Sequence, residues 1–184
     1  MFDKDVRIYG KHANYWKDLC ELPGNVPDRE MHSNFKIFKS YVDAYILCPL
    51  IGFQYNRKGM PDSDKGTNAG MLAEVLSKRQ RELKYVYQLI MLLDEDSEPD
   101  KDKRLFRAFK FAEETPEDAA LIKKNMETFT SYFLGGLEVL HEEFVEQCVD
   151  VDDYLNKIYE FTKLFDDLQN EDVLKEKIDK MINS

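Results

Sequence analysis

Apolar side chains recur every three or four residues along most of this chain, and no stretch alternates apolar and polar residues for long. The first spacing is that of an amphipathic α-helix, whereas a half-buried strand would need strict alternation. We therefore predict an all-α fold, a bundle of six or seven helices. No motif returns at a fixed period, which excludes a repeat architecture.

Size and composition predict one folded domain. The chain has 184 residues, of which 43% are hydrophobic, and it contains 12 Phe, 10 Tyr and one Trp. A domain of this length hides roughly 70% of the surface of its unfolded chain, so it needs no disulfide or metal to supply a core. We expect a single helical domain over residues 1–184. Its two exposed loops are expected at 59–70 and 94–103, where Gly, Pro and charged residues collect.

Local signals place the helices. Thr115 is followed by Pro116 and, three residues on, by Asp118, which predicts a proline-initiated helix with a capping box. Gly135 and Gly136 interrupt the apolar face of that helix, and we interpret them as a point where another backbone comes close. The remaining signals predict helices at 12–21, at 34–58 after Ser33 with a kink at Pro49, at 71–93 and 103–113, at 116–148, after Asp150 or Asp152, and after Asn170.

The cysteines and the apolar segments predict a cytoplasmic protein. Cys20, Cys48 and Cys148 are odd in number and form no CxxC pair, which favours reduced thiols over a disulfide framework or a zinc site. The first residues mix charges without an apolar run, unlike a secretory signal. The longest apolar stretch, 44–53, is about half the length that a membrane span requires, so we expect no membrane contact.

Charge is divided unevenly in this acidic protein, whose formal net charge is −10. Residues 1–93 carry 14 basic and 11 acidic side chains, whereas residues 94–184 carry 12 and 25. The acidic second part repels a phosphate backbone, which leaves only the first part eligible for nucleic acid. Five residues there form the basic concentration that could contact phosphate or an acidic partner, unless they are an ordinary solvated face: Arg57, Lys58, Lys78, Arg81 and Lys84.

No motif predicts catalysis or a bound cofactor. Glu138 and His141 have the Glu-x-x-His spacing of di-iron bundles, but such a site needs this motif twice and two further Glu residues. We therefore interpret the pair as polar neighbours on a solvated flank. The chain has no P-loop, dinucleotide fingerprint or nucleophile elbow. We expect a non-enzymatic protein with no catalytic residue, no metal and no cofactor.

Arg79 conflicts with the periodic pattern, because it falls inside the apolar arc between Leu76 and Leu83. An unpaired buried guanidinium costs several kcal/mol, which leaves three alternatives. The side chain extends outward to water, pairs with an acid of its own chain, or meets a partner at an interface.

Two short runs, 37–43 and 51–57, resemble small helical accessory proteins encoded with bacterial DNA-modification or phage-defence systems. The resemblance carries no diagnostic motif and assigns no residue a role. It enters only the second of two functional hypotheses, a nucleic-acid-associated accessory protein that contacts phosphate through the basic residues of 57–84.

The leading hypothesis is a protein-interaction or adaptor subunit of a cytoplasmic assembly, with a protein partner or self-association. The apolar stripe from Phe35 to Phe53 motivates it, because that stripe is wide enough to be either the centre of the bundle or an oligomer contact.

Overall fold

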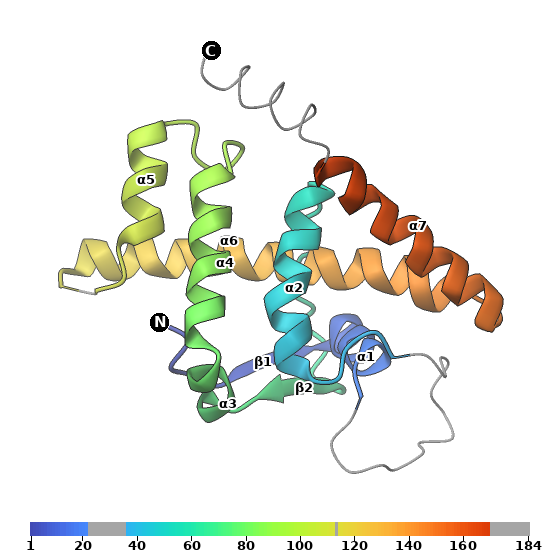
Figure 1. Cartoon of the computed structure of the whole chain (residues 1–184). Helices are drawn as coiled ribbons and strands as arrows, with labels where there is room; N and C mark the ends of the chain where they lie inside the picture. Colours follow the sequence, from blue (N-terminus) through green and yellow to red (C-terminus); the bar gives the residue numbers. More distant parts are fainter. Residues whose placement is uncertain (22–35, 113, 170–184) are drawn as a thin grey trace. The chain divides into compact units, whose positions relative to one another are not determined.

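The computed structural model describes residues 1–21, 36–112 and 114–169 (Figure 1). These residues form seven α-helices and a small two-stranded sheet, which confirms the predicted all-α class. The chain divides into two compact units, residues 1–145 and 146–184. The helix predicted after Asn170 lies outside the described residues. None of the described helices combines the length and apolar character needed to cross a membrane.

The first unit is organised by the crossing of α2 (Tyr41–Gln54) over α6 (Pro116–His141). A Cβ atom on Gly136 would overlap the carbonyl oxygen of Cys48, and one on Gly52 would overlap the carbonyl oxygen of Tyr132. Only glycine allows two backbones to approach this closely. A Cβ on Gly135 would likewise overlap a backbone carbonyl, so the close crossing predicted at residues 135 and 136 is confirmed.

Both ends of α6 follow local rules. The hydroxyl of Thr115 accepts the N–H of Asp118, and the Asp118 carboxylate accepts the N–H of Thr115, which confirms the capping box. The α-helix ends at His141, and a π-helical turn (Glu142–Glu146) replaces the last part of the predicted helix.

The start of α2 differs from the prediction. Residues 36–40 are not helical, because Phe38 forms a bridge with Cys20 through hydrogen bonds to the backbone beside it. Ser40 is the N-cap, and its hydroxyl accepts the N–H of Asp43. Ser33 lies outside the described residues. The helix passes through Pro49 and ends at Gln54, four residues before the predicted end.

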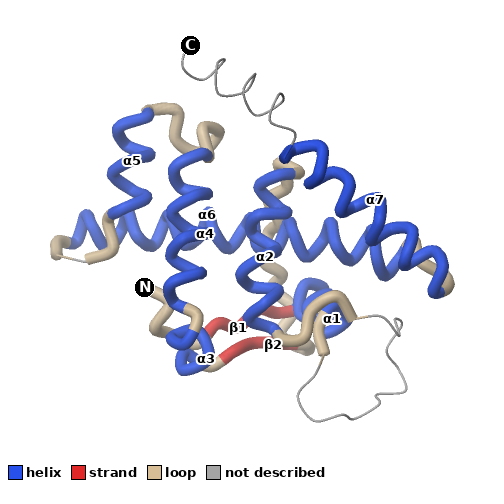
Figure 2. Tube along the Cα trace, viewed as in Figure 1, coloured by secondary structure: helices blue, strands red, loops and turns tan. Residues whose placement is uncertain are grey.

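Two short strands were not predicted. β1 (Val6–Tyr9) pairs in antiparallel register with β2 (Asn68–Met71), and Figure 2 shows them as the two red segments. Four residues are too few for alternation to stand out from chance. The first three residues of β2, 68–70, belong to the segment that was predicted as the exposed loop 59–70. Their pairing with β1 holds this end of the segment beside the N-terminal residues.

The predicted helix 71–93 is wrong in its first third. Met71 belongs to β2, and two helices follow, α3 (Ala73–Lys78) and α4 (Gln80–Leu93). Arg79 separates them with non-helical backbone angles, φ −117° and ψ 21°. The physical reason is non-local, because strand pairing extends residues 68–71 and the Arg79 side chain reaches an acid on α2.

The core of the first unit is aromatic. Figure 1 shows α2 and α4 side by side across α6, with α1 (Gly10–Leu19) near one end of α2. Six rings from these helices and the N-terminal segment contact one another in edge-to-face or tilted pairs: Phe2, Trp16, Tyr45, Tyr87, Phe129 and Phe133. The apolar stripe of α2 is thus the centre of its own bundle, which removes that stripe as a reason for self-association.

Two further helices complete the described chain. α5 (Lys101–Phe109) packs beside α4 in the first unit. α7 (Val151–Gln169) belongs to the second unit and begins after Asp150, whose carboxylate accepts the N–H of Asp153. Asp150 is one of the two predicted caps for that helix.

Candidate functional site

Glu138 is the centre of a charged network that the sequence did not predict. Its Oε1 lies 2.9 Å from both Lys11 Nζ and His12 Nε2, and its Oε2 accepts Arg57 Nε at 3.0 Å. The two terminal nitrogens of Arg57 donate to Glu142 at 2.5 and 2.6 Å. Glu138 is only 8% exposed, so its placement on a solvated flank is wrong. The network joins α1, the segment after α2, and the end of α6.

His141 lies beside this network but has other neighbours. Its Nε2 is 3.3 Å from Asp18 Oδ2, and its ring stacks on Tyr15 with 3.9 Å between centroids. Glu138 and His141 therefore do not converge on a common point. Within the described residues, no three His, Cys, Asp or Glu side chains are placed to hold a metal ion.

The electrostatics of the network favour fixed charges over proton transfer. Burial raises the pKa of Glu138, but hydrogen bonds from Lys11 and His12 outweigh burial and hold that pKa below its ordinary value. The hydrogen bond to Glu138 raises the pKa of Lys11. Burial lowers the pKa of His12, against the opposing effect of Glu138. The neutral His12 ring then donates Nε2–H to the carboxylate, and each charge of the network has a partner.

His12 predicts a dependence of stability on pH. A base whose pKa is lower in the folded state takes up a proton on unfolding, so acid favours the unfolded chain. Stability is expected to fall as pH drops below the ordinary His12 pKa of 6.5, with a slope of at most about 1.4 kcal/mol per pH unit. Urea unfolding at several pH values between 7.5 and 5 measures this slope. His12→Gln, which keeps a donor for Glu138, should flatten it.

The contribution of Glu138 is expected at lower pH and does not interfere with this test. Its folded pKa is depressed, so its stabilisation is lost only as pH falls below about 4.5. Equal slopes for wild type and His12→Gln between pH 7.5 and 5 would contradict a neutral buried His12.

The five basic residues of 57–84 do not form one face. Arg57 has its guanidinium occupied by two glutamates, and Lys58 contacts Ser97 and lies 4.8 Å from the centre of the Tyr132 ring. Lys78 is on α3, where it pairs with Glu74.

Arg81 and Lys84 are on α4, beyond the break at Arg79. The Lys84 ammonium lies 5.4 Å from the centre of the Phe111 ring. Lys78 therefore lies on a different helix from Arg81 and Lys84, and the three do not share one helix face. A contact of these residues with phosphate or an acidic partner stays a prediction.

Arg79 forms ion pairs within its own chain. Its Nη1 lies 3.1 Å from Asp43 Oδ1, and its Nε lies 2.7 Å from Glu82 Oε1. The side chain is 38% exposed, so the pairs lie at the surface and join α4 to α2. The break in the helix at this residue turns it away from the apolar arc.

Arg79→Ala is expected to lower the free energy of unfolding by about 0.5–1 kcal/mol, because half-exposed ion pairs contribute little in water. Thermal melts of both proteins measure the loss, and size-exclusion profiles should coincide. A loss of about 3 kcal/mol or more, the cost of breaking a buried pair, would contradict the surface placement.

α5 has its arginines on the inside. Arg107 Nε donates to the carbonyl of Met91 at 2.9 Å and its Nη2 to that of Asp94 at 2.8 Å, while Arg104 Nε donates to that of Leu92 at 3.0 Å. These carbonyls belong to the end of α4, where helical partners are missing and the helix dipole favours positive charge. Both arginines are buried, at 8% exposure or less.

The opposite side of α5 carries large apolar side chains. Leu105, Phe106 and Phe109 are 52%, 56% and 58% exposed. Periodicity alone places these three residues toward the core and the two arginines toward water, which is the reverse of the structure. The signal that could have revealed this is the pair of arginines three residues apart, just after a helix end that needs donors.

Comparisons with protein-family models, with curated proteins and with solved structures found no significant match to this chain.

Proposed function

We propose that this chain is a non-enzymatic protein-interaction subunit that presents α5 as an anchoring helix to an apolar groove on a partner protein. The observation that carries the proposal is the outward orientation of Leu105, Phe106 and Phe109 on a helix whose arginines are held inside. We call these three side chains the α5 face.

Hydrogen bonds fix the orientation of the α5 face. Rotating α5 by half a turn would bury the three apolar side chains, but it would remove the arginine donors from the carbonyls at the end of α4. Buried carbonyls without partners cost about 1–3 kcal/mol each. The exposed apolar surface is therefore a stable property of the unit, and full burial of such a side chain by a partner is worth about 1.5–3 kcal/mol.

The size of the α5 face favours a groove over a flat contact. Nine residues make a helix of about 13 Å, and a stable flat interface buries about 800 Å² on each partner. Three side chains on so short a helix supply much less area. A groove that encloses the helix buries more of each anchor, and apolar anchors about one turn apart are what helix-binding grooves recognise.

We infer a reducing, cytoplasmic setting for this assembly. Cys20 and Cys48 are buried free thiols in the first unit, and burial raises the pKa of each well above its ordinary value. Such thiols are poor nucleophiles, consistent with a structural place in the core and with the absence of disulfides among the described residues.

Site-specific photocrosslinking in native cells tests the proposal. A photoreactive amino acid at Phe106 should crosslink to one partner, whereas the same group at Glu127, an exposed residue of α6, should not. The purified partner should bind the Phe106→Ser/Phe109→Ser protein at least about tenfold more weakly than wild type. The melting temperature of this variant should stay within a few degrees, because both side chains are already exposed.

Other outcomes distinguish the alternatives. Partner binding that survives the double substitution contradicts the proposal. A doubled mass in light scattering that the substitution abolishes identifies the partner as a second copy. A mobility shift of DNA that weakens with salt and with Arg81→Ala/Lys84→Ala would favour the nucleic-acid hypothesis instead.

A further inference from the structure

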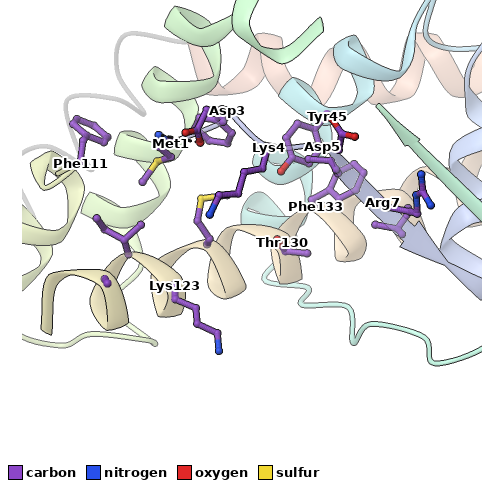
Figure 3. Close-up of a pocket in the computed structure, with 16 residues that line it drawn as sticks. Met1, Asp3, Lys4, Asp5, Arg7, Tyr45, Phe111, Lys123, Thr130 and Phe133 are labelled. Atoms are coloured by element: carbon purple, nitrogen blue, oxygen red, sulfur yellow. Dashed lines mark ion pairs between the residues drawn. The ribbon is translucent and has the colours of Figure 1, made fainter. Parts of the chain in front are cut away.

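A cleft of about 790 Å³ lies between the N-terminal segment and α6, and none of the α5-face residues lines it (Figure 3). Residues 1–8 form one wall, and α6 forms the other. Single side chains from α2 and from the segment after α5 close it, and the α6 wall consists of Ala119, Ile122, Lys123, Met126, Thr130 and Phe133.

The N-terminal wall includes a strand with one free edge. β1 pairs with β2 on one side, and no other strand among the described residues pairs with its second side. Val6, Arg7 and Ile8 of β1 line the cleft. Unpaired N–H and C=O groups along a strand edge are a template for another extended chain.

The α6 wall supplies an apolar strip. Its lining positions follow helical spacing from Ala119 to Phe133, and apart from Lys123 and Thr130 they are apolar. Fourteen residue steps on a helix span about 21 Å, the length of about six residues of extended chain. The strip and the strand edge therefore match the dimensions of one short peptide.

The acidic side chains that line the cleft have ion-pair or hydrogen-bond partners among the described residues, whereas the basic ones do not. Asp3 lies 3.5 Å from the N-terminal amine, and the Asp5 carboxylate accepts the N–H of Ala73 at 2.9 Å. Within the part of the chain that the structure describes, the side chains of Lys4, Arg7 and Lys123 form no ion pair or hydrogen bond. Lys4 lies between the two walls in Figure 3, whereas the Lys123 ammonium lies at the outer side of α6. The unpaired charge of the cleft is therefore positive.

We propose that the cleft binds an extended acidic peptide as a third strand on the free edge of β1. Alternate apolar side chains of the peptide pack on the α6 strip, and the carboxylates on its other side meet Lys4 and Arg7. This mode takes affinity from backbone hydrogen bonds and specificity from alternate side chains. The site is separate from the α5 face, and its test does not depend on the partner of that face.

Binding of a synthetic peptide tests the proposal. The probe is a labelled, end-capped hexapeptide of alternating glutamate and isoleucine, and fluorescence anisotropy of the full chain measures its affinity. Lys4→Glu and Arg7→Glu should each weaken binding at least about threefold, and together about tenfold. Lys65→Glu makes the same charge change on an exposed loop outside the cleft and should leave binding unchanged.

Two further probes separate strand addition from other binding. The same peptide with N-methyl groups on alternate backbone nitrogens cannot complete a ladder and should lose binding, whereas amide signals of residues 5–9 should shift only with the unmodified peptide. No binding of the unmodified peptide, or equal binding of the methylated one, overturns the proposal. Binding of dodecanoate without binding of the peptide overturns it in favour of a fatty-acid site.

Discussion

Gly136→Val is expected to lower the free energy of unfolding by more than about 3 kcal/mol, the largest effect of any single substitution considered. Even the Cβ atom would overlap the carbonyl oxygen of Cys48, which is a backbone atom of a helix and cannot rotate aside. α2 and α6 would have to separate along their whole contact, and the aromatic core between them would lose its packing. Gly52→Ala, on the facing helix, should cost about 3 kcal/mol for the same reason.

Gly66→Ala is the matched control for both glycine variants. A Cβ at Gly66 would lie 3.1 Å from a carboxylate oxygen of the exposed Asp64 side chain, which can move. Its stability should stay within about 0.5 kcal/mol of wild type. Urea unfolding of the three variants measures the differences. A loss below about 1 kcal/mol for Gly136→Val would show that the two backbones do not touch there.

Glu138→Ala is expected to lower the free energy of unfolding by about 1–3 kcal/mol, the largest effect expected outside the glycine crossing. The substitution leaves the Arg57 guanidinium with Glu142 alone and removes the only hydrogen-bond partner of the buried His12 ring among the described residues. Glu138→Gln should cost less than Glu138→Ala, because the amide oxygen still accepts one hydrogen bond while the charge is lost.

The exposed Glu127 on the same helix provides the control for this second prediction. Glu127→Ala removes the same carboxylate without a buried partner and should change stability by less than about 0.5 kcal/mol. Chemical unfolding at pH 7 compares the variants. Equal stability of Glu138→Ala and Glu127→Ala would mean that the network contributes nothing to the fold.

Much of the helical fold was predictable because its signals are local. The capping box at Thr115 and the start of α7 at Asp150 each depend on residues within one helical turn. The crossing at Gly136 was predictable for a related reason, since two adjacent glycines in a long amphipathic helix lower its intrinsic stability unless another backbone approaches.

The errors have non-local causes. α2 begins only after Ser40 because Phe38 is paired with Cys20 at the end of α1. The helix predicted over 71–93 breaks at Arg79, where the guanidinium reaches Asp43. Neither partner is near in sequence, so periodicity extended both helices too far. The sequence pattern did not predict the two strands, because each is extended only through its pairing with the other.

The charged network and the α5 face were unpredictable for a deeper reason. Sequence pattern places a glutamate on a helix in solvent unless its partners are known. The partners of Glu138 come from α1 and from the segment after α2, which are distant in sequence. Arg104 and Arg107 read as surface residues because their acceptors are backbone carbonyls, which no side-chain pattern reveals.

The α2–α6 crossing also determines how this chain must be synthesised. α2 is complete at Gln54, but the glycine against which it packs is Gly136, more than half the described chain later. At about 5–20 residues per second, several seconds pass between the appearance of these two segments from the ribosome. During that interval the face of α2 that α6 covers stays exposed, which favours binding of the nascent chain by chaperones until α6 emerges.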